Sequence, residues 1–114
     1  MIKVEEYLAS DGKNHYREWF NDLTVEYAAK VAAARSRMMA GSLGNVKPLD
    51  GTLKEFRIDW GPGIRIYLLQ DGDKLIVLLG GGTKGSQKAD IKRARELRDE
   101  YEARKTEMKK GIKG

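Results

Sequence analysis

KEFRIDWGPGIRIYLLQDGDKLIVLLGGGTKGSQKAD, residues 54–90, is the stretch that decides the fold of this chain. Residues 54–60 alternate apolar and charged side chains, which is the period-two pattern of a half-buried strand. A Gly-Pro-Gly turn follows, then a second run at residues 64–69, and an Asp-Gly hairpin leads into a third at residues 74–79. The stretch therefore predicts three consecutive antiparallel strands that end in a glycine-rich corner.

One face of this predicted sheet is apolar, and the other carries cations. By strand alternation, Arg57, Arg65 and Tyr67 share the second face. Guanidinium groups bind phosphate oxygens bidentately, so this face is a candidate anion-binding surface. The arginines could instead pair with Glu55 and Asp59 in surface salt bridges, which is the commoner arrangement for charged residues on a sheet.

The rest of the chain predicts helices around this sheet. Tyr16, Trp19, Phe20 and Leu23 fall at the spacing of one helical face, which favours core packing over base stacking. We expect an α+β fold, in which a small antiparallel sheet of about four strands packs against two N-terminal helices and is followed by a long C-terminal helix. The expected outer elements are a strand at residues 2–8, a short helix at 14–23, a helix from Thr24 to Gly41 or Gly44, a connector at 41–52 and a helix at 86–108.

The composition limits the chemistry open to this chain. With 114 residues, 40% of them hydrophobic, it can form one domain with its own core. We expect that domain at residues 1–108 and a flexible basic tail at 109–114. There is no cysteine, and His15 is the single histidine. We therefore expect no metal centre, no cofactor and no serine-histidine-acid triad.

Charge and hydropathy suggest the surroundings of the protein. The net charge is +5, with most of the excess in residues 87–114, which suits a polyanionic partner or simply a solvated helix. The N-terminus lacks the features of a signal peptide, and the longest apolar run, residues 75–79, is far shorter than the roughly 20 residues of a membrane span. We expect a cytoplasmic protein without a membrane partner.

The glycine run at residues 80–86, GGGTKGS, lies between a predicted strand and a predicted helix, where phosphate-binding loops occur. It is not a P-loop, because Lys84 precedes the last glycine instead of following it. Two interpretations stay open. The glycines either let the backbone approach a phosphate, or they let the chain turn tightly against Trp60 or another large side chain.

A cluster of Arg, Lys and Tyr suits the cleavage of RNA by its own 2'-hydroxyl. This reaction requires a proton acceptor near the hydroxyl and cations that stabilise the charge of the transition state. Lysine or tyrosine could exchange protons if neighbouring cations lowered their pKa values.

The sequence of the central region closely resembles sequences of the RelE/ParE toxin superfamily of type II toxin-antitoxin systems. The most specific motifs are FRIDWGPGIRIY and LLGGGTKGSQKADI, and the resemblance spans about residues 15–102. Within the superfamily it is nearest to the HigB-type addiction module killer proteins and their phage relatives. It implies a toxin that cleaves mRNA on the ribosome without a metal (an mRNA interferase, that is, an endoribonuclease) and a cognate helix-turn-helix antitoxin as partner.

The resemblance also implies roles for individual residues. The expected catalytic residues are Arg65, Lys84, Gln87 and Tyr67, and the expected RNA- or phosphate-binding residues are Arg57, Lys54, Lys88 and Arg98. The chain departs from the best-described nucleases, since its glycine-rich corner holds neither histidine nor tyrosine. Two other functions therefore stay open: a non-enzymatic toxin that poisons DNA gyrase, and an inactive remnant that binds an antitoxin and regulates an operon.

Overall fold

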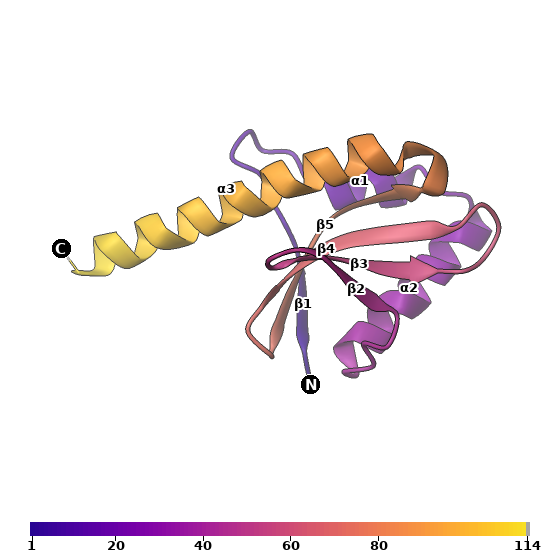
Figure 1. Ribbon diagram of the computed structural model, residues 1–114, viewed down its shortest axis with the longest axis horizontal. Helices are drawn as coiled ribbons and strands as arrows, with labels where there is room; N and C mark the ends of the chain where they lie inside the picture. The colour runs from indigo at the N-terminus through magenta and orange to yellow at the C-terminus, as the bar shows by residue number, and fades with distance from the viewer. Residues whose placement is uncertain (114) are drawn as a thin grey trace.

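The computed structural model describes residues 1–113, with side chains as far as Lys109, and contains one five-stranded sheet (Figure 1). The strand order is β1-β5-β4-β3-β2. The elements are β1 (Lys3–Glu6), α1 (His15–Asn21), α2 (Val25–Met39), β2 (Val46–Asp50), β3 (Leu53–Ile58), β4 (Ile64–Asp71), β5 (Leu75–Thr83), the short 3-10 helix η1 (Lys84–Ser86) and α3 (Gln87–Lys113).

The predicted α+β fold is confirmed, and so are the three central antiparallel strands β3, β4 and β5. Two details differ. The predicted connector at residues 41–52 contains the edge strand β2, because Val46 and Leu49 alternate toward the two cores. The first strand pairs with β5 in parallel, so the sheet is mixed. No hairpin joins β1 to β5, and the long connection between them leaves either direction open.

Side chains cap the two N-terminal helices as their sequences suggest. Asn14 caps α1 by accepting a hydrogen bond from the backbone of Arg17, and Thr24 caps α2 by accepting one from Tyr27. The helix α3 begins at Gln87 and its backbone continues to Lys113, beyond the predicted end at residue 108. Gly114 and the side chains after Lys109 lie outside the described residues, and with them most of the predicted flexible tail.

Helices cover both faces of the sheet. The first core lies between the sheet and α1 and α2, and it contains Tyr16, Val31, Met38, Phe56 and Ile66 among its buried residues. The second core lies under α3 and contains Leu53, Tyr67, Leu69, Val77 and Leu97. The alternation predicted from the sequence therefore directs side chains of the same strand into two different cores.

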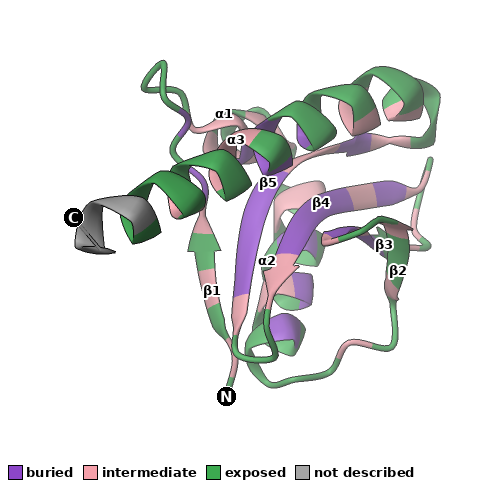
Figure 2. Ribbon diagram, turned by 60° about the vertical axis from the view of Figure 1, so that its left-hand side comes forward, coloured by how far each residue is buried: buried purple, intermediate pink, exposed green. Residues whose placement is uncertain are grey.

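Burial decreases from the centre of the molecule outward. Figure 2 shows the buried residues concentrated in β4 and β5, whereas the edge strands β1 and β2 are half-buried or exposed. The second half of α3 extends past the sheet (Figure 1), and Met108 on it is 70% exposed. None of the helices in the described residues has the length and apolarity that crossing a bilayer requires.

Candidate anion-binding site

The strand register brings the predicted arginines together. Arg57 on β3 lies directly opposite Arg65 on β4, and Glu55 lies opposite Tyr67 on the same pair of strands. Strand alternation places all four side chains on the α3 side of the sheet. The predicted shared face is therefore confirmed, and two guanidinium groups meet on it.

Glu55 holds the two guanidinium groups together. Its side chain is fully buried, and its Oε1 accepts hydrogen bonds from Arg57 Nε at 2.7 Å and from Arg65 Nη1 at 3.0 Å. The prediction that the arginines pair with Glu55 is confirmed, but the pairs are not at the surface as expected. Asp59, the other expected partner, forms none of the ion pairs found among the described residues, so Glu55 alone supplies the counter-charge to the two arginines there.

The sequence contains a signal for this role of Glu55. Like charges directly opposite each other on adjacent strands repel, so a pair such as Arg57 and Arg65 requires a nearby anion. Glu55 is two residues from Arg57 on the same face. Its burial could not be inferred, because it results from packing that the local pattern does not show.

Polar atoms of this cluster lack partners. Among the described residues, Glu55 Oε2, Arg65 Nε and Tyr67 OH are buried and form no hydrogen bond. A buried polar atom without a partner costs about 1–3 kcal/mol, so such atoms are rare in folded proteins. Arg65 Nε is a donor and Glu55 Oε2 is an acceptor, so together they match a ligand that offers both kinds of group.

The arginines differ in how accessible they are. The side chain of Arg57 is 48% exposed, whereas that of Arg65 is 14% exposed. A ligand approaching this site meets Arg57 first. Because both guanidinium groups share one carboxylate, the cluster keeps one net positive charge.

Tyr67 is on the same face, but its environment does not suit proton transfer. It is 1% exposed, and burial raises the pKa of its hydroxyl to about 12, with the charges of Glu55 and Asp90 acting in the same direction. The prediction that neighbouring cations lower this pKa is therefore wrong for Tyr67. Its hydroxyl stays protonated near neutral pH.

The predicted residues at the glycine-rich end lie where β5 continues into η1 and α3. Lys84 is exposed in η1, Lys88 is exposed on α3, and Gln87 is half-buried as the first residue of α3. Within the described part of the chain, none of their side chains forms a hydrogen bond or ion pair with the arginines. Their predicted roles in catalysis and binding stay predictions.

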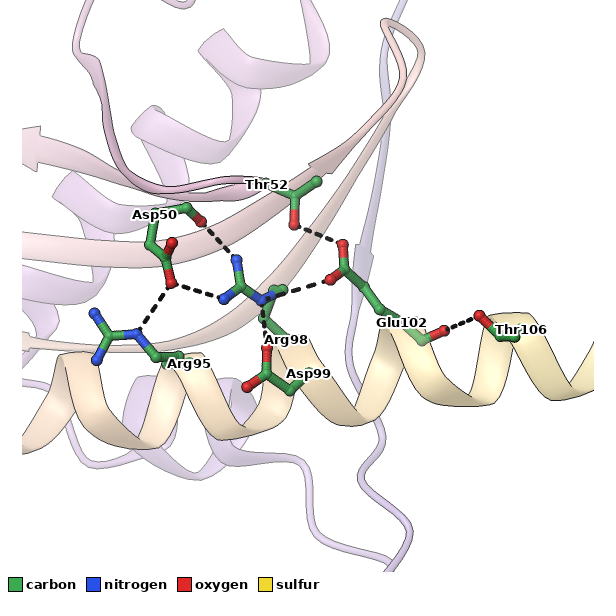
Figure 3. A network of polar contacts seen from close by, with 7 residues as sticks. All are labelled: Asp50, Thr52, Arg95, Arg98, Asp99, Glu102 and Thr106. Carbon is green, nitrogen blue, oxygen red and sulfur yellow. Dashed lines mark hydrogen bonds and ion pairs between the residues drawn. The ribbon is translucent and has the colours of Figure 1, made fainter.

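Lys54 and Arg98 already have structural partners. Lys54 Nζ donates to Gln70 Oε1 at 2.8 Å, and strand alternation places Lys54 on the face opposite the arginines. Arg98 is 7% exposed, and it binds Asp50 on β2 and Asp99 on its own helix (Figure 3). Its guanidinium therefore fixes α3 to the β2–β3 turn, and its predicted role in RNA binding stays a prediction.

The glycine run does not form the predicted corner. Gly80, Gly81 and Gly82 belong to β5, and the chain turns only at η1. Any side chain at Gly81 would collide with the ring of Trp19, and any at Gly82 would collide with Asp90. The interpretation of close packing against a large side chain is correct, with Trp19 in place of Trp60.

Comparison with known proteins places the chain beside one relative. No family model matches it. A protein of Haemophilus influenzae that bears the name "Uncharacterized protein" is 36% identical over 86 residues, which are 75% of this chain and 87% of that protein. The chain belongs to the family of this protein. The name of the relative states no activity, so the function of this family member has to be argued from its site.

The site of this family member suits an anionic ligand with a hydroxyl group. Arg57 and Arg65 offer charge-assisted donors to a phosphate, and Glu55 Oε2 offers an acceptor to a hydroxyl. Among the described residues, no group of three His, Cys, Asp or Glu side chains is arranged to hold a metal ion.

Proposed function

We propose that this chain is the toxin of a type II toxin-antitoxin system of the RelE/ParE kind, and that it cleaves mRNA on the ribosome. The observation that carries the proposal is the pair of unpartnered buried atoms at one site, the donor Arg65 Nε and the acceptor Glu55 Oε2. RNA offers a phosphate to the donor and a 2'-hydroxyl to the acceptor on adjacent atoms of one nucleotide. The resemblance of the β3–β5 region to HigB-type killer proteins supports the same function.

The proposed reaction is the attack of a ribose 2'-oxygen on the adjacent phosphorus. Arg57 is half-exposed, so it binds the phosphate first and shifts with it. Arg65 then donates hydrogen bonds to the nonbridging oxygens of the phosphate. Negative charge increases on these oxygens in the transition state, so fixed guanidinium groups lower the barrier. Glu55 Oε2 accepts the proton of the 2'-hydroxyl and directs the oxygen toward phosphorus. The bond between phosphorus and the 5'-oxygen of the next nucleotide breaks, and this oxygen leaves with the electron pair and takes a proton from water.

The proposed function includes partners and a place of action. A cognate helix-turn-helix antitoxin would cover part of the surface of the toxin. The exposed cations of α3, Lys88 among them, would contact phosphates of ribosomal RNA. A target on the ribosome implies action in the cytoplasm.

The experiment is induction of the protein in bacterial cells, with growth and transcript ends followed by primer extension. The wild type should stop growth and produce cuts that keep the phase of the codons. Arg65→Ala should reduce cutting by roughly a hundredfold, the usual effect of removing one fixed donor from a developing oxyanion. Arg65→Lys should not restore it, because an ammonium group lacks the planar fork of guanidinium.

The matched control is Arg37→Ala, which removes the same charge from an exposed position in the last turn of α2. It should cut RNA as the wild type does. Intact messages during growth arrest that Arg65→Ala abolishes would reject the nuclease. A DNA damage response with gyrase bound to the protein would then identify a gyrase poison, and unaffected growth with antitoxin binding would identify a regulatory remnant.

A further inference from the structure

A second feature of the molecule is a cavity of about 370 Å³ between α1, α3 and the end of β5. Its floor is the glycine run of β5, and its lining does not include Glu55, Arg57 or Arg65. It is therefore distinct from the arginine site, although Tyr67 lies between the two.

The cavity is acidic in a chain whose net charge is +5. Glu18 and Asp22 line it from α1, and Asp90 lines it from α3. Among the described side chains, no Lys, Arg or His lies within 4 Å of these carboxylates, since none of the ion pairs includes them. Arg93 is the single guanidinium on the wall. Three carboxylates against one guanidinium leave an excess of negative charge.

Favourable interactions with the helix dipoles explain the positions of two of these carboxylates but not that of the third. Glu18 and Asp90 lie in the first turns of α1 and α3, where a negative charge complements the helix dipole. Asp22 is the C-cap of α1, where the dipole disfavours a carboxylate. A cationic ligand would remove this unfavourable interaction.

An unpartnered polar group also borders the cavity. Tyr67 is 1% exposed and lines the cavity, and its hydroxyl forms no hydrogen bond within the described residues. A hydroxyl can accept as well as donate a hydrogen bond, so it can serve a cationic donor that enters from the cavity. This observation is independent of the charge count.

The edge of β5 beside the cavity is free. The strand β1 pairs with β5 only as far as Leu78, where Tyr7 N donates to Leu78 O at 2.9 Å. Among the described strands, only β4 lies beside residues 80–83 of β5. An unpaired strand edge is a template for an extended peptide, and glycines leave its backbone uncovered.

We propose that this cavity binds the guanidinium group of an arginine side chain, which an extended segment of a partner protein delivers by pairing with the free edge of β5. Guanidinium has five donors, so it can bind more than one of the acceptors that line the cavity, which are Glu18, Asp22, Asp90 and the Tyr67 hydroxyl. It also stacks on indole, and the ring of Trp19 forms one wall. An ammonium group has fewer donors and no planar face. The proposal does not depend on RNA cleavage.

The test is an NMR titration of the ¹⁵N-labelled wild-type protein with N-acetyl-arginine amide, and with N-acetyl-citrulline amide as the neutral isostere. The arginine compound should shift the amide signals of Gly80, Gly81 and Gly82 and the indole signal of Trp19 in a saturable way. Its Kd should be on the order of 1 mM, as expected for a ligand of this size. Raising the salt concentration should weaken binding.

Variants distinguish binding in this cavity from non-specific attraction between charges. Glu18→Gln and Asp22→Asn should each weaken binding about 3–10-fold, and the double variant should abolish it. Glu26→Gln removes the same charge from an exposed residue of α2 outside the cavity and should leave the Kd unchanged. A peptide with valine and threonine around one arginine should bind at least about tenfold more tightly than the amide, because it adds backbone pairing. Equal binding of the citrulline compound, or an unchanged Kd in the double variant, would overturn the proposal.

Discussion

Glu55 determines what the arginine face can do. Without it, two guanidinium groups would lie opposite each other in a half-buried part of the sheet, which like charges disfavour. With it, both groups are fixed by one oxygen, and the second oxygen is left without a partner. This arrangement costs stability in the free protein and keeps a donor and an acceptor in place for a ligand.

We predict that Glu55→Gln lowers the free energy of unfolding by about 2–3 kcal/mol in urea titrations near pH 7. The amide oxygen can still accept hydrogen bonds, but a neutral side chain cannot balance the charges of Arg57 and Arg65, and a charge left without its partner in a buried site is costly. The half-exposed position of Arg57 keeps the effect below that of a fully buried pair.

The control is Asp59→Asn, which removes a carboxylate from an exposed position directly after the end of β3. Surface substitutions of this kind change stability by less than about 0.5 kcal/mol. Equal effects of the two substitutions would show that the burial of Glu55 has no energetic consequence.

At the scale of elements, α3 is fixed to the sheet through Arg98. Its guanidinium donates to the backbone oxygen of Asp50, to the Asp50 carboxylate at 2.9 Å and to Asp99 at 2.7 Å (Figure 3). Thr52 adds a hydrogen bond to Glu102 at 2.9 Å. These contacts attach the β2–β3 turn to the middle of the helix, at the point where α3 covers the second core.

We predict that Arg98→Ala lowers the free energy of unfolding by about 2–3 kcal/mol, because it empties a buried volume and removes the donor to the backbone oxygen of Asp50. Hydrogen exchange should also become faster in the amides of α3. Arg95→Ala is the matched control, since Arg95 contacts the same Asp50 at 3.2 Å but is 48% exposed. It should cost less than about 1 kcal/mol. Similar losses for both variants would contradict the anchoring role of Arg98.

The helices and strands show how much of the fold local sequence patterns can predict. Period-two alternation predicted β3, β4 and the face that Arg57 and Arg65 share, because alternation depends only on strand geometry. The edge strand β2 was missed, since its short segment contains Pro48 and lies among glycines. The burial of Glu55 and Arg98 was missed for another reason. It depends on where α3 lies, and that position is set by contacts between residues far apart in the sequence.

At the scale of the whole molecule, two carboxylates connect the N-terminal segment to the helices on either side of the sheet. Glu6 on β1 accepts hydrogen bonds from Asn14 at 3.0 Å, from Arg17 on α1 and from Arg35 on α2. Glu100 on α3 accepts hydrogen bonds from Tyr7 and Ser10. The edge strand therefore depends on ionised carboxylates as well as on its ladder with β5.

These contacts make the stability of the molecule depend on pH. Hydrogen bonds from Arg17 lower the pKa of Glu6 to about 2, from 4.5, even though burial acts in the opposite direction. Hydrogen bonds from Tyr7 and Ser10 lower the pKa of Glu100 to about 2 as well. A carboxyl whose folded pKa is lowered contributes its full stability above the unfolded pKa and loses it as the pH falls through the folded value. The loss is therefore expected between about pH 4.5 and pH 2.

We predict that Glu6→Gln is less stable than the wild type by about 2 kcal/mol near pH 7, and that the difference disappears as the pH falls from about 4.5 to 2. Urea titrations across this range measure it, and since Glu100 titrates in both proteins, the difference isolates Glu6. Glu5→Gln is the matched control, because Glu5 is the preceding residue of β1 and, among the described side chains, forms an ion pair only with the exposed Lys3. Its effect should stay below about 0.5 kcal/mol at every pH. A Glu6→Gln deficit as large at about pH 2 as at pH 7 would mean that packing around residue 6, and not the charge of its carboxylate, holds β1 to α1 and α2.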